Sequence, residues 1–161
     1  MNIGAEKILP ALGAFSLAMI AGVLGFQYLG HIPPCEMCQW QRWPHFAAIA
    51  VGLGGWLLLQ AGLIERCPTV WLAAAAALLI AISGAIGVYH AGVEWRFWAG
   101  PSACTGSAFQ LTGGPLDLNA PIVRCDVAAW RLFGISLAGY NAIISLGVAA
   151  IAAVLLLRKK S

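Results

Sequence analysis

Two cysteines separated by two residues, Cys35 and Cys38, have a spacing that indicates redox chemistry. Such a pair closes a small, reversible disulfide at a helix N-terminus, where unpaired N–H groups and the helix dipole stabilise a thiolate. Arg42 follows Cys38 by four residues, so the two side chains share one helix face. Its permanent cation favours the thiolate and can polarise a carbonyl acceptor. Pro44 allows either a helix that begins near Trp43 or an earlier helical turn kinked at the proline.

Other interpretations of the same cysteine pair differ in how well its neighbours support them. A haem-attachment motif requires a histidine directly after the second cysteine, and Gln39 stands there, which argues against haem. A metal site could combine Cys35 and Cys38 with His31 or His45, because thiolate and imidazole are common metal ligands. A purely structural disulfide is the third alternative. The last two stay open on the residues alone.

A second cysteine pair, Cys104 and Cys125, brackets a stretch that predicts irregular structure. The interval holds Gly106, Gly113, Gly114, Pro115 and Pro121. A structural disulfide that closes this loop is one interpretation. The other is thiol–disulfide exchange with a partner protein, which requires access to one sulfur and a stabilised leaving thiol. Taken with the first pair, the sequence favours a relay between two disulfides.

Three polar residues, His90, Glu94 and Arg96, are expected just beyond the third apolar stretch, at the depth of Cys38 and Arg42. Such a group is often only a solvated helix end. The functional alternative is that His90 binds an oxygen of the electron acceptor or supplies protons during its reduction.

The composition excludes an ordinary soluble domain. Hydrophobic residues make up 61% of the chain and charged residues 9%, whereas soluble domains are about half apolar and about a quarter charged. Lipid is the solvent that suits such a chain. The net charge of +3 is small and dispersed, so no nucleic-acid partner is expected.

Four apolar stretches predict an all-α integral membrane protein with a single domain, 1–161, built as a four-transmembrane-helix bundle. They cover about 8–29, 46–63, 70–89 and 133–157, and each approaches the roughly 20 residues that span a bilayer. None alternates like a barrel strand. The first stretch is longer than the apolar part of a signal peptide, so we expect it to be retained. The loops on the far side cover about 30–45 and 90–132.

Four spans put both termini on one side, and the cysteines indicate that this side is the cytoplasm. Basic residues give only a weak preference, five against four. They are Lys7, Arg66, Arg158, Lys159 and Lys160 on the terminal side, and Arg42, Arg96, Arg124 and Arg131 on the other. With cytoplasmic termini, Cys67 alone faces the reducing compartment and the other four cysteines face the oxidising one. Cys67 is then a small buried or interfacial residue.

The chain resembles the bacterial disulfide bond formation protein B (DsbB) family over nearly its whole length. Shared features are the four spans, the Cys-x-x-Cys pair with its following arginine, and the spaced pair in the second external loop. The most specific stretch is Cys35-Glu36-Met37-Cys38-Gln39-Trp40-Gln41-Arg42-Trp43-Pro44. His90 to Glu94 and Ala129-Trp130-Arg131-Leu132-Phe133-Gly134 are further points of similarity.

The resemblance implies a redox cycle in the bacterial inner membrane, with the catalytic cysteines facing the periplasm. A reduced thiol oxidase of the DsbA type attacks the Cys104–Cys125 disulfide, and Cys104 forms the mixed disulfide. Electrons then pass to the Cys35–Cys38 pair. Family members can carry a membrane-lying helix in the second external loop, and the Gly/Pro-rich interval leaves its presence here open.

The resemblance also implies that the electron acceptor is a membrane quinone, either ubiquinone or menaquinone. Cys38 is the sulfur that engages the quinone as a thiolate. Arg42 lies beside it, and His90 is the further quinone-binding residue. The resemblance implies no metal cofactor.

Two competing functions belong to other classes: a metal-binding or transporting membrane protein, and a structural membrane protein with static disulfides. A transporter is expected to carry polar residues inside its spans. The candidates in these spans are Ser16, Gln60, Ser83, Tyr140, Asn141 and Ser145. This short set weighs against transport.

Overall fold

The computed structural model describes residues 3–65, 69–105 and 123–158. The predictions for Cys67 and for a membrane-lying helix between Cys104 and Cys125 lie outside these residues. The described elements are α1 (Ile3–Tyr28), α2 (Glu36–Ile49), the π-helical turn η1 (Ala50–Gly54), α3 (Gly55–Gln60), α4 (Thr69–Glu94), α5 (Ser102–Thr105), β1 (Arg131–Leu132), β2 (Ile135–Ser136) and α6 (Leu137–Arg158).

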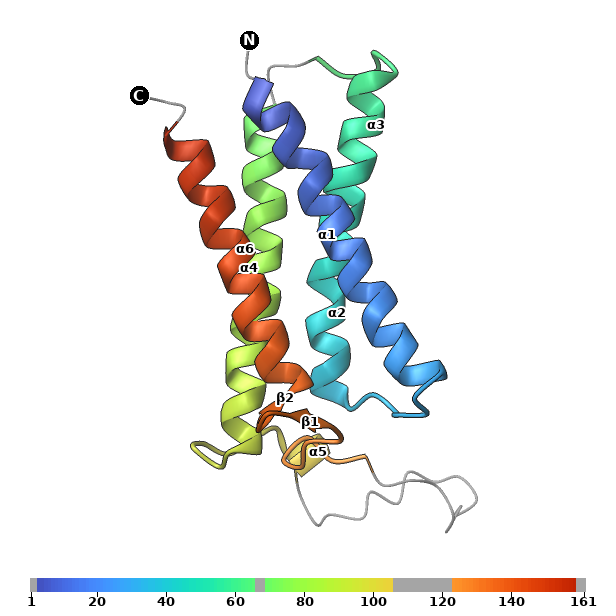
Figure 1. The fold of residues 1–161 in the computed structure, drawn as a ribbon, viewed down its shortest axis with the longest axis vertical. Coiled ribbons are helices and arrows are strands. Elements are labelled where there is room, and N and C mark those ends of the chain that lie inside the picture. The colour runs from blue at the N-terminus through green and yellow to red at the C-terminus, as the bar shows by residue number, and fades with distance from the viewer. Residues whose placement is uncertain (1–2, 66–68, 106–122, 159–161) are drawn as a thin grey trace.

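Four long helical segments form the bundle: α1, the continuous run α2–η1–α3, α4 and α6 (Figure 1). The expected all-helical, four-helix architecture is confirmed. The helices meet through small side chains, which allow backbones to approach closely in lipid. The main cluster of buried residues is Leu12, Ala48, Ala76, Ala77, Ile80, Ala149 and Ala152.

Three of these helices are individually long and apolar enough to cross a membrane. They are Gly4–Tyr28, Thr69–Glu94 and Leu137–Arg158, with mean hydropathies of 2.0, 2.2 and 2.2. The fourth crossing is made by α2, η1 and α3 together. Large apolar side chains point outwards from the bundle, as Trp71 and Leu157 do with exposed fractions of 77% and 69%. Lipid is the environment in which that surface is stable.

The second crossing begins earlier than the apolar pattern indicates. The apolar stretch predicted a span from about residue 46, and the helix that contains it already begins at Glu36, where Cys35 caps it. Cys35 has extended backbone (φ −78°, ψ 172°), and its Sγ accepts a hydrogen bond from the Cys38 backbone N–H at 3.2 Å. This is the N-cap arrangement, with sulfur in place of the usual oxygen. Pro44 lies inside α2, so of its two alternatives the earlier helical start is the one observed.

The helices α4 and α6 also differ in extent from the apolar stretches that predicted the third and fourth spans. α4 continues to Glu94, so His90 and Glu94 belong to its last turns rather than to the loop after it. Residues 131–136 form a small antiparallel hairpin, and α6 begins at Leu137 instead of 133. Phe133 and Gly134 have φ of 50° and 81°. Two consecutive positive φ angles are typical of a type I′ hairpin turn and incompatible with a right-handed helix.

The two ends of the bundle differ in what they carry. The start of α1 and the end of α6 lie at the same end of the bundle in Figure 1. The start of α2, the short helix α5 and the β1–β2 hairpin lie together at the opposite end. All four described cysteines belong to this second end, so the fold brings together residues that are up to 90 positions apart in the chain, from Cys35 to Cys125.

Candidate active site

Cys35 and Cys38 lie at the N-terminus of α2 as free thiols. Cys35 is buried and Cys38 is half-buried. Their Sγ atoms and the His90 ring lie within 4.8 Å of one another, close enough for a disulfide to form by side-chain rotation. Hydrogen bonding to the Cys38 side chain, together with burial, raises the pKa of the Cys35 thiol. Cys35 therefore keeps its proton, and Cys38 is the sulfur that can carry a thiolate.

The second pair is a disulfide, Cys104–Cys125, with Cα atoms 5.4 Å apart. Its two sulfurs have different surroundings. Cys125 has an exposed fraction of 0%, whereas Cys104, in α5, is half-buried. The Cys125 backbone N–H donates to the Cys104 carbonyl at 2.9 Å, which fixes the two backbones side by side. A soluble thiol reaches Cys104 more readily than Cys125.

Both pairs belong to a single packed group, which we call the four-cysteine cluster. Its members are Cys35, Met37, Val93 and Cys125, with Cys38, Cys104 and Val123 packed against them. The sequence predicted two pairs on one side of the membrane but gave no contact between them. The contact arises because Val123 and Cys125 pack with residues at the start of α2 and near the end of α4. Exchange between the pairs can therefore proceed without a solvent-exposed intermediate.

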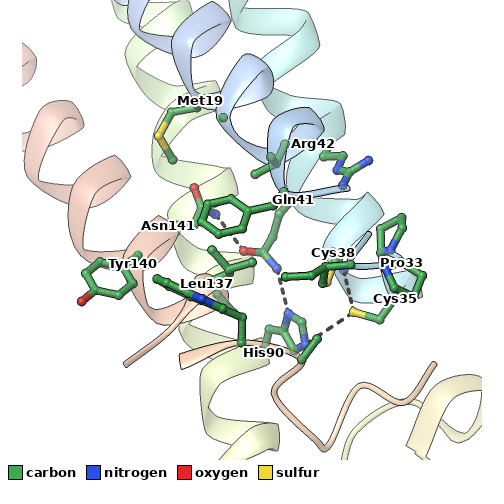
Figure 2. Close-up of a pocket in the computed structure, with 18 of the residues that line it drawn as sticks. Met19, Pro33, Cys35, Cys38, Gln41, Arg42, His90, Leu137, Tyr140 and Asn141 are labelled. Carbon is green, nitrogen blue, oxygen red and sulfur yellow. Dashed lines mark hydrogen bonds between the residues drawn. The ribbon is translucent and has the colours of Figure 1, made fainter. Parts of the chain in front are cut away.

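His90 is the histidine that the fold brings to this cluster (Figure 2). Its Nε2 lies 3.6 Å from the Cys35 Sγ. Its Nδ1 lies 2.8 Å from the Gln41 Nε2, which also donates to the Met37 carbonyl at 3.2 Å. The backbone of Cys125 is a further hydrogen-bonding neighbour of the ring. His90 thus contacts residues from both cysteine pairs.

Glu94 lies one turn beyond His90 on α4, and its side chain is only 5% exposed. Its Oε1 is 3.7 Å from the His90 Nε2. Ser136 and Arg131 of the hairpin also interact with the carboxyl group. Its Oε2 is buried and has no hydrogen-bond partner among the described residues. A carboxyl oxygen without a partner is costly to bury, which marks this position as a functional candidate.

A cavity of about 410 Å³ opens beside these residues. Ligand sites of a few hundred Å³ commonly combine apolar walls with a few polar groups. Here the polar lining residues include Cys38, Gln41, Arg42, His90 and Glu94. The apolar wall comes from α1 and α6 and includes Met19, Val23, Phe26, Leu137 and Ile144. The cavity suits a mostly apolar ligand that carries a few polar atoms.

Arg42 lines this cavity one helical turn after Cys38, as its spacing predicted. Its Nη1 donates to the Gln27 Oε1 at 2.7 Å, which ties α2 to the end of α1. The partner amide leaves the guanidinium its full positive charge. Gln27 was not singled out from the sequence, because nothing in its local pattern relates it to a residue 15 positions away.

The similarity of the chain to known proteins agrees with this arrangement. A family model described as "Disulfide bond formation protein DsbB" matches residues 6–155. The chain belongs to the DsbB family. Its members are membrane proteins with four transmembrane helices that take part in disulfide bond formation. The chain is therefore a multi-pass membrane protein and, by family, a thiol oxidoreductase.

This DsbB-family chain is also similar to a single protein, Uncharacterized protein RP370 of Rickettsia prowazekii (strain Madrid E). The two are 26% identical over 140 residues, which cover 83% of this chain and 74% of the relative. No solved structure matches the chain.

The candidate metal ligands in this DsbB-family site differ from those that the sequence predicted. The donor atoms that lie together are those of Cys35, Cys38 and His90. His31 and His45, the histidines expected from the sequence, are not in that group. His45 instead faces Ser16 at 3.2 Å through its Nδ1.

Sequence reasoning missed the buried polar network that supports the DsbB-family site. Gln41 and Asn141 meet at 2.8 Å, and Asn141 also contacts Ser83 and Ser145. Three of these residues had been counted as isolated polar positions within apolar spans. Their occurrence inside otherwise apolar helices was the available signal, because such groups need partners in lipid. Which partner each one has depends on helix rotation, which the sequence pattern does not give.

Proposed function

We propose that this protein oxidises a periplasmic thiol oxidase of the DsbA type and passes the electrons through its two cysteine pairs to a membrane quinone. The observation that carries the proposal is the four-cysteine cluster, whose Cys35 and Cys38 line a mostly apolar cavity. One pair has a reachable sulfur, the other faces the cavity, and the two pack together. Static disulfides would need neither the contact nor the cavity.

The first step takes place at Cys104. A thiolate of the reduced partner attacks the Cys104 Sγ, so that a bond between the partner and Cys104 forms and the Cys104–Cys125 bond breaks. Cys125 leaves with the electron pair. A second partner thiolate then attacks the partner's own sulfur in the mixed disulfide, which releases oxidised partner and leaves Cys104 reduced. The half-buried position of Cys104 supports its role as the attacked sulfur.

The second step transfers the two electrons to the inner pair. In the oxidised protein, Cys35 and Cys38 form a disulfide, and the Cys125 thiolate attacks Cys35. The Cys35–Cys38 bond breaks, and Cys38 leaves as a thiolate. Cys104 then attacks Cys125, which restores the Cys104–Cys125 disulfide and leaves Cys35 reduced. The choice of sulfurs is supported by the burial of both Cys125 and Cys35 in the four-cysteine cluster.

In the last step, Cys35 and Cys38 are reoxidised, and their two electrons pass to an acceptor in the cavity. A quinone supplies the capacity to accept two electrons and two protons, and it leaves as a quinol. Cys38, Arg42 and His90 all line the cavity. Cys38 is the electron donor, Arg42 supplies positive charge, and His90 supplies a polar ring nitrogen. The apolar wall from α1 and α6 excludes water and receives the tail. The quinone is either ubiquinone or menaquinone.

We further propose that the protein lies in the bacterial inner membrane with the cysteine-bearing end facing the periplasm. Disulfides persist in oxidising compartments and are rare in the cytoplasm. An orientation with the four-cysteine cluster in the cytoplasm would keep both pairs reduced and remove the partner thiol oxidase from reach. The proposal therefore joins the localisation to the chemistry.

The proposal is tested with purified full-length protein, a reduced DsbA-type partner and a short-chain quinone, by following quinone absorbance. We expect reduction of the quinone and oxidation of the partner in equal amounts. Cys38→Ala should abolish quinone reduction but still allow a mixed disulfide between Cys104 and the partner to be trapped. No reduction by the wild-type protein, with a competent partner and intact disulfides, would overturn the proposal. A metal-binding protein would instead retain a soft metal ion and leave the quinone unchanged.

A further inference from the structure

Closing the Cys35–Cys38 disulfide requires a group that takes a proton from Cys35. Identifying this group rests on the proposed function. The dithiol loses two electrons and two protons as the Cys35–Cys38 bond forms, and both protons end on the two oxygens of the acceptor. Cys38 can react as a thiolate, but Cys35 is buried and must be deprotonated in place before it attacks Cys38. The candidates beside Cys35 are His90 and Glu94.

The hydrogen positions around His90 are fixed by backbone carbonyls, which can only accept. Asn141 Nδ2 lies 3.1 Å from the Ser83 carbonyl, so that nitrogen must be the NH₂ group. The same Nδ2 donates to the Gln41 Oε1 at 2.8 Å. The Gln41 NH₂ group therefore points the other way, where it donates to the Met37 carbonyl at 3.2 Å. Neither amide can rotate without placing two donors or two acceptors face to face.

The orientation of Gln41 then determines the tautomer of His90. Gln41 Nε2 donates to the His90 Nδ1 at 2.8 Å, so Nδ1 must be the unprotonated nitrogen. A neutral ring in that state carries its proton on Nε2, which points at the Cys35 Sγ (Figure 2). The same nitrogen lies 3.7 Å from the Glu94 Oε1. His90 has used its one lone pair on Gln41. It can donate a hydrogen bond to the site but cannot take up a proton there, and its Nε2–H also opposes metal coordination.

The same logic extends through the rest of the network. Asn141 Oδ1 accepts from Ser145 Oγ at 2.8 Å and faces His45 Nε2 at 3.2 Å. His45 is thereby held with its proton on Nε2 as well, and its Nδ1 accepts from Ser16 Oγ at 3.2 Å. Every donor in the chain of contacts has an acceptor. The network therefore fixes the orientation of each side chain, and neither histidine has a free lone pair that could take up a proton.

Glu94 is the group left to take the proton. Its side chain is 95% buried, lines the cavity, and has one oxygen with no partner among the described residues. Its other oxygen lies 3.7 Å from the His90 Nε2, which is itself 3.6 Å from the Cys35 sulfur. The sulfur and the carboxyl group are therefore on the same side of the ring. The charged, titratable or polar groups around Glu94 are Cys35, Cys38, His90, Arg131 and Ser136.

We infer that Glu94 carries the Cys35 proton to the reduced acceptor, while Gln41 and Asn141 are positioning residues that hold His90 as an Nε2–H donor to the developing Cys35 thiolate. The proton leaves Cys35 Sγ, rests on Glu94, and passes to an acceptor oxygen in the cavity. The Cys35 sulfur attacks the Cys38 sulfur while that sulfur is bonded to the acceptor. The S–S bond forms, the bond between Cys38 and the acceptor breaks, and its electron pair stays on the acceptor. No further oxidant or reductant is needed.

The carboxylate role is tested without a quinone, in full-length protein with Cys67, Cys104 and Cys125 replaced by serine. The reduced protein is mixed with an aromatic disulfide that releases a coloured thiolate. A first release reports attack by Cys38, and a second reports attack by Cys35 on the mixed disulfide. We expect Glu94→Gln to slow the second release by at least about 100-fold, the lower end of general-base effects, and to leave the first unchanged.

The pH dependence separates a proton carrier from a structural anchor. In the wild-type protein the second release should rise with pH as Glu94 loses its proton, and this limb should be missing in Glu94→Gln. Glu94→Asp should restore part of the rate. If Glu94→Gln lowers thermal stability but leaves the second release and its pH profile unchanged, Glu94 only anchors the hairpin and the inference fails. These outcomes do not depend on quinone reduction, so they are distinct from failure of the proposed function.

The positioning role is tested by ¹⁵N NMR of histidine-labelled protein near neutral pH. We expect the His90 resonances to show a protonated Nε2 and an unprotonated Nδ1. Gln41→Glu places a carboxylate beside Nδ1 and should move the proton to Nδ1. Ser16→Ala is the matched control, because Ser16 contacts His45 and not His90. A wild-type His90 with its proton on Nδ1 would overturn this part of the inference.

Discussion

Two cysteines of identical chemistry play different roles here because they occupy different positions at one helix end. Cys35 is the N-cap, is buried, and contacts His90. Cys38 lies one turn further on, half-buried at the cavity. Hydrogen bonding to Cys38, together with burial, raises the pKa of Cys35. The asymmetry is a property of the turn that the Cys-x-x-Cys spacing forms, rather than of either residue.

This asymmetry predicts the order in which the reduced thiols react with an alkylating reagent. A raised pKa leaves Cys35 protonated at neutral pH, so Cys38 should be modified first and Cys35 should react faster as the pH rises. Cys38→Ala removes the largest cause of the raised pKa, and in that variant Cys35 should react faster than in the wild-type protein. Peptide mass spectrometry of timed samples measures both rates. Equal rates at the two cysteines would contradict the assignment.

Arg42 is expected to act on the acceptor rather than on the partner protein. Arg42→Ala should raise the apparent KM for the quinone by about 10-fold, the loss of one hydrogen bond to a charged group. Trapping of the mixed disulfide at Cys104 should be unaffected. Gln27→Ala should give a smaller increase, because Gln27 only fixes the guanidinium. Gln39→Ala, at an exposed position on the same helix, is the control. An unchanged KM in Arg42→Ala would remove Arg42 from the site.

At the scale of the elements, the sequence predicted what hydropathy controls and missed what local caps and tertiary contacts control. The four crossings follow from apolar length alone. The start of α2 at Glu36 depends on a cap formed by a cysteine sulfur, which hydropathy does not detect. The hairpin at 131–136 depends on positive φ angles at Phe133 and Gly134. The glycine was visible in the sequence, but the phenylalanine beside it is an unusual residue for that conformation.

The crossing of α1 and η1 depends on two glycines. A Cβ added to Gly52 would lie 2.7 Å from the Cα of Gly13, so the two backbones are in direct contact. Gly52→Ala should lower the free energy of unfolding by about 1–3 kcal/mol, the usual cost of overpacking. Gly54→Ala, in the same π-helical turn, has open space at its Cβ and should be neutral. Thermal unfolding in detergent compares the two variants. Similar melting temperatures for them would show that the helices can separate without cost.

At the scale of the whole molecule, the bundle inverts the distribution of polarity found in soluble proteins. Its exterior carries large apolar side chains such as Trp71, and the interior holds alanines together with the network of Gln41, Asn141 and His45. The sequence indicated that polar residues occurred in the spans, but the contacts between them join positions up to 100 residues apart. Helix rotation and crossing angles determine those contacts. A pattern of apolar residues around most of each helix leaves them undetermined.

The position of the termini makes the orientation of the molecule testable. The start of α1 and the end of α6 lie at the end of the bundle opposite the four-cysteine cluster (Figure 1). If the cluster faces the oxidising periplasm, the C-terminus lies in the cytoplasm. A fluorescent protein fused after Ser161 should then be bright, and an alkaline phosphatase that needs disulfides should be inactive there. A phosphatase fused after Gly100, on the cysteine side, should be active.

The number of basic residues on each side predicts the orientation only weakly, because the difference is five against four. The redox argument is stronger, since it requires the two cysteine pairs to share a compartment with their partner. Active phosphatase at the C-terminal fusion, with an inactive one after Gly100, would put both pairs in a reducing environment. A protein with that orientation could not form disulfides in a partner, because its cysteine pairs would be kept reduced. Orientation is therefore the property of the whole molecule on which the chemistry of the four-cysteine cluster depends.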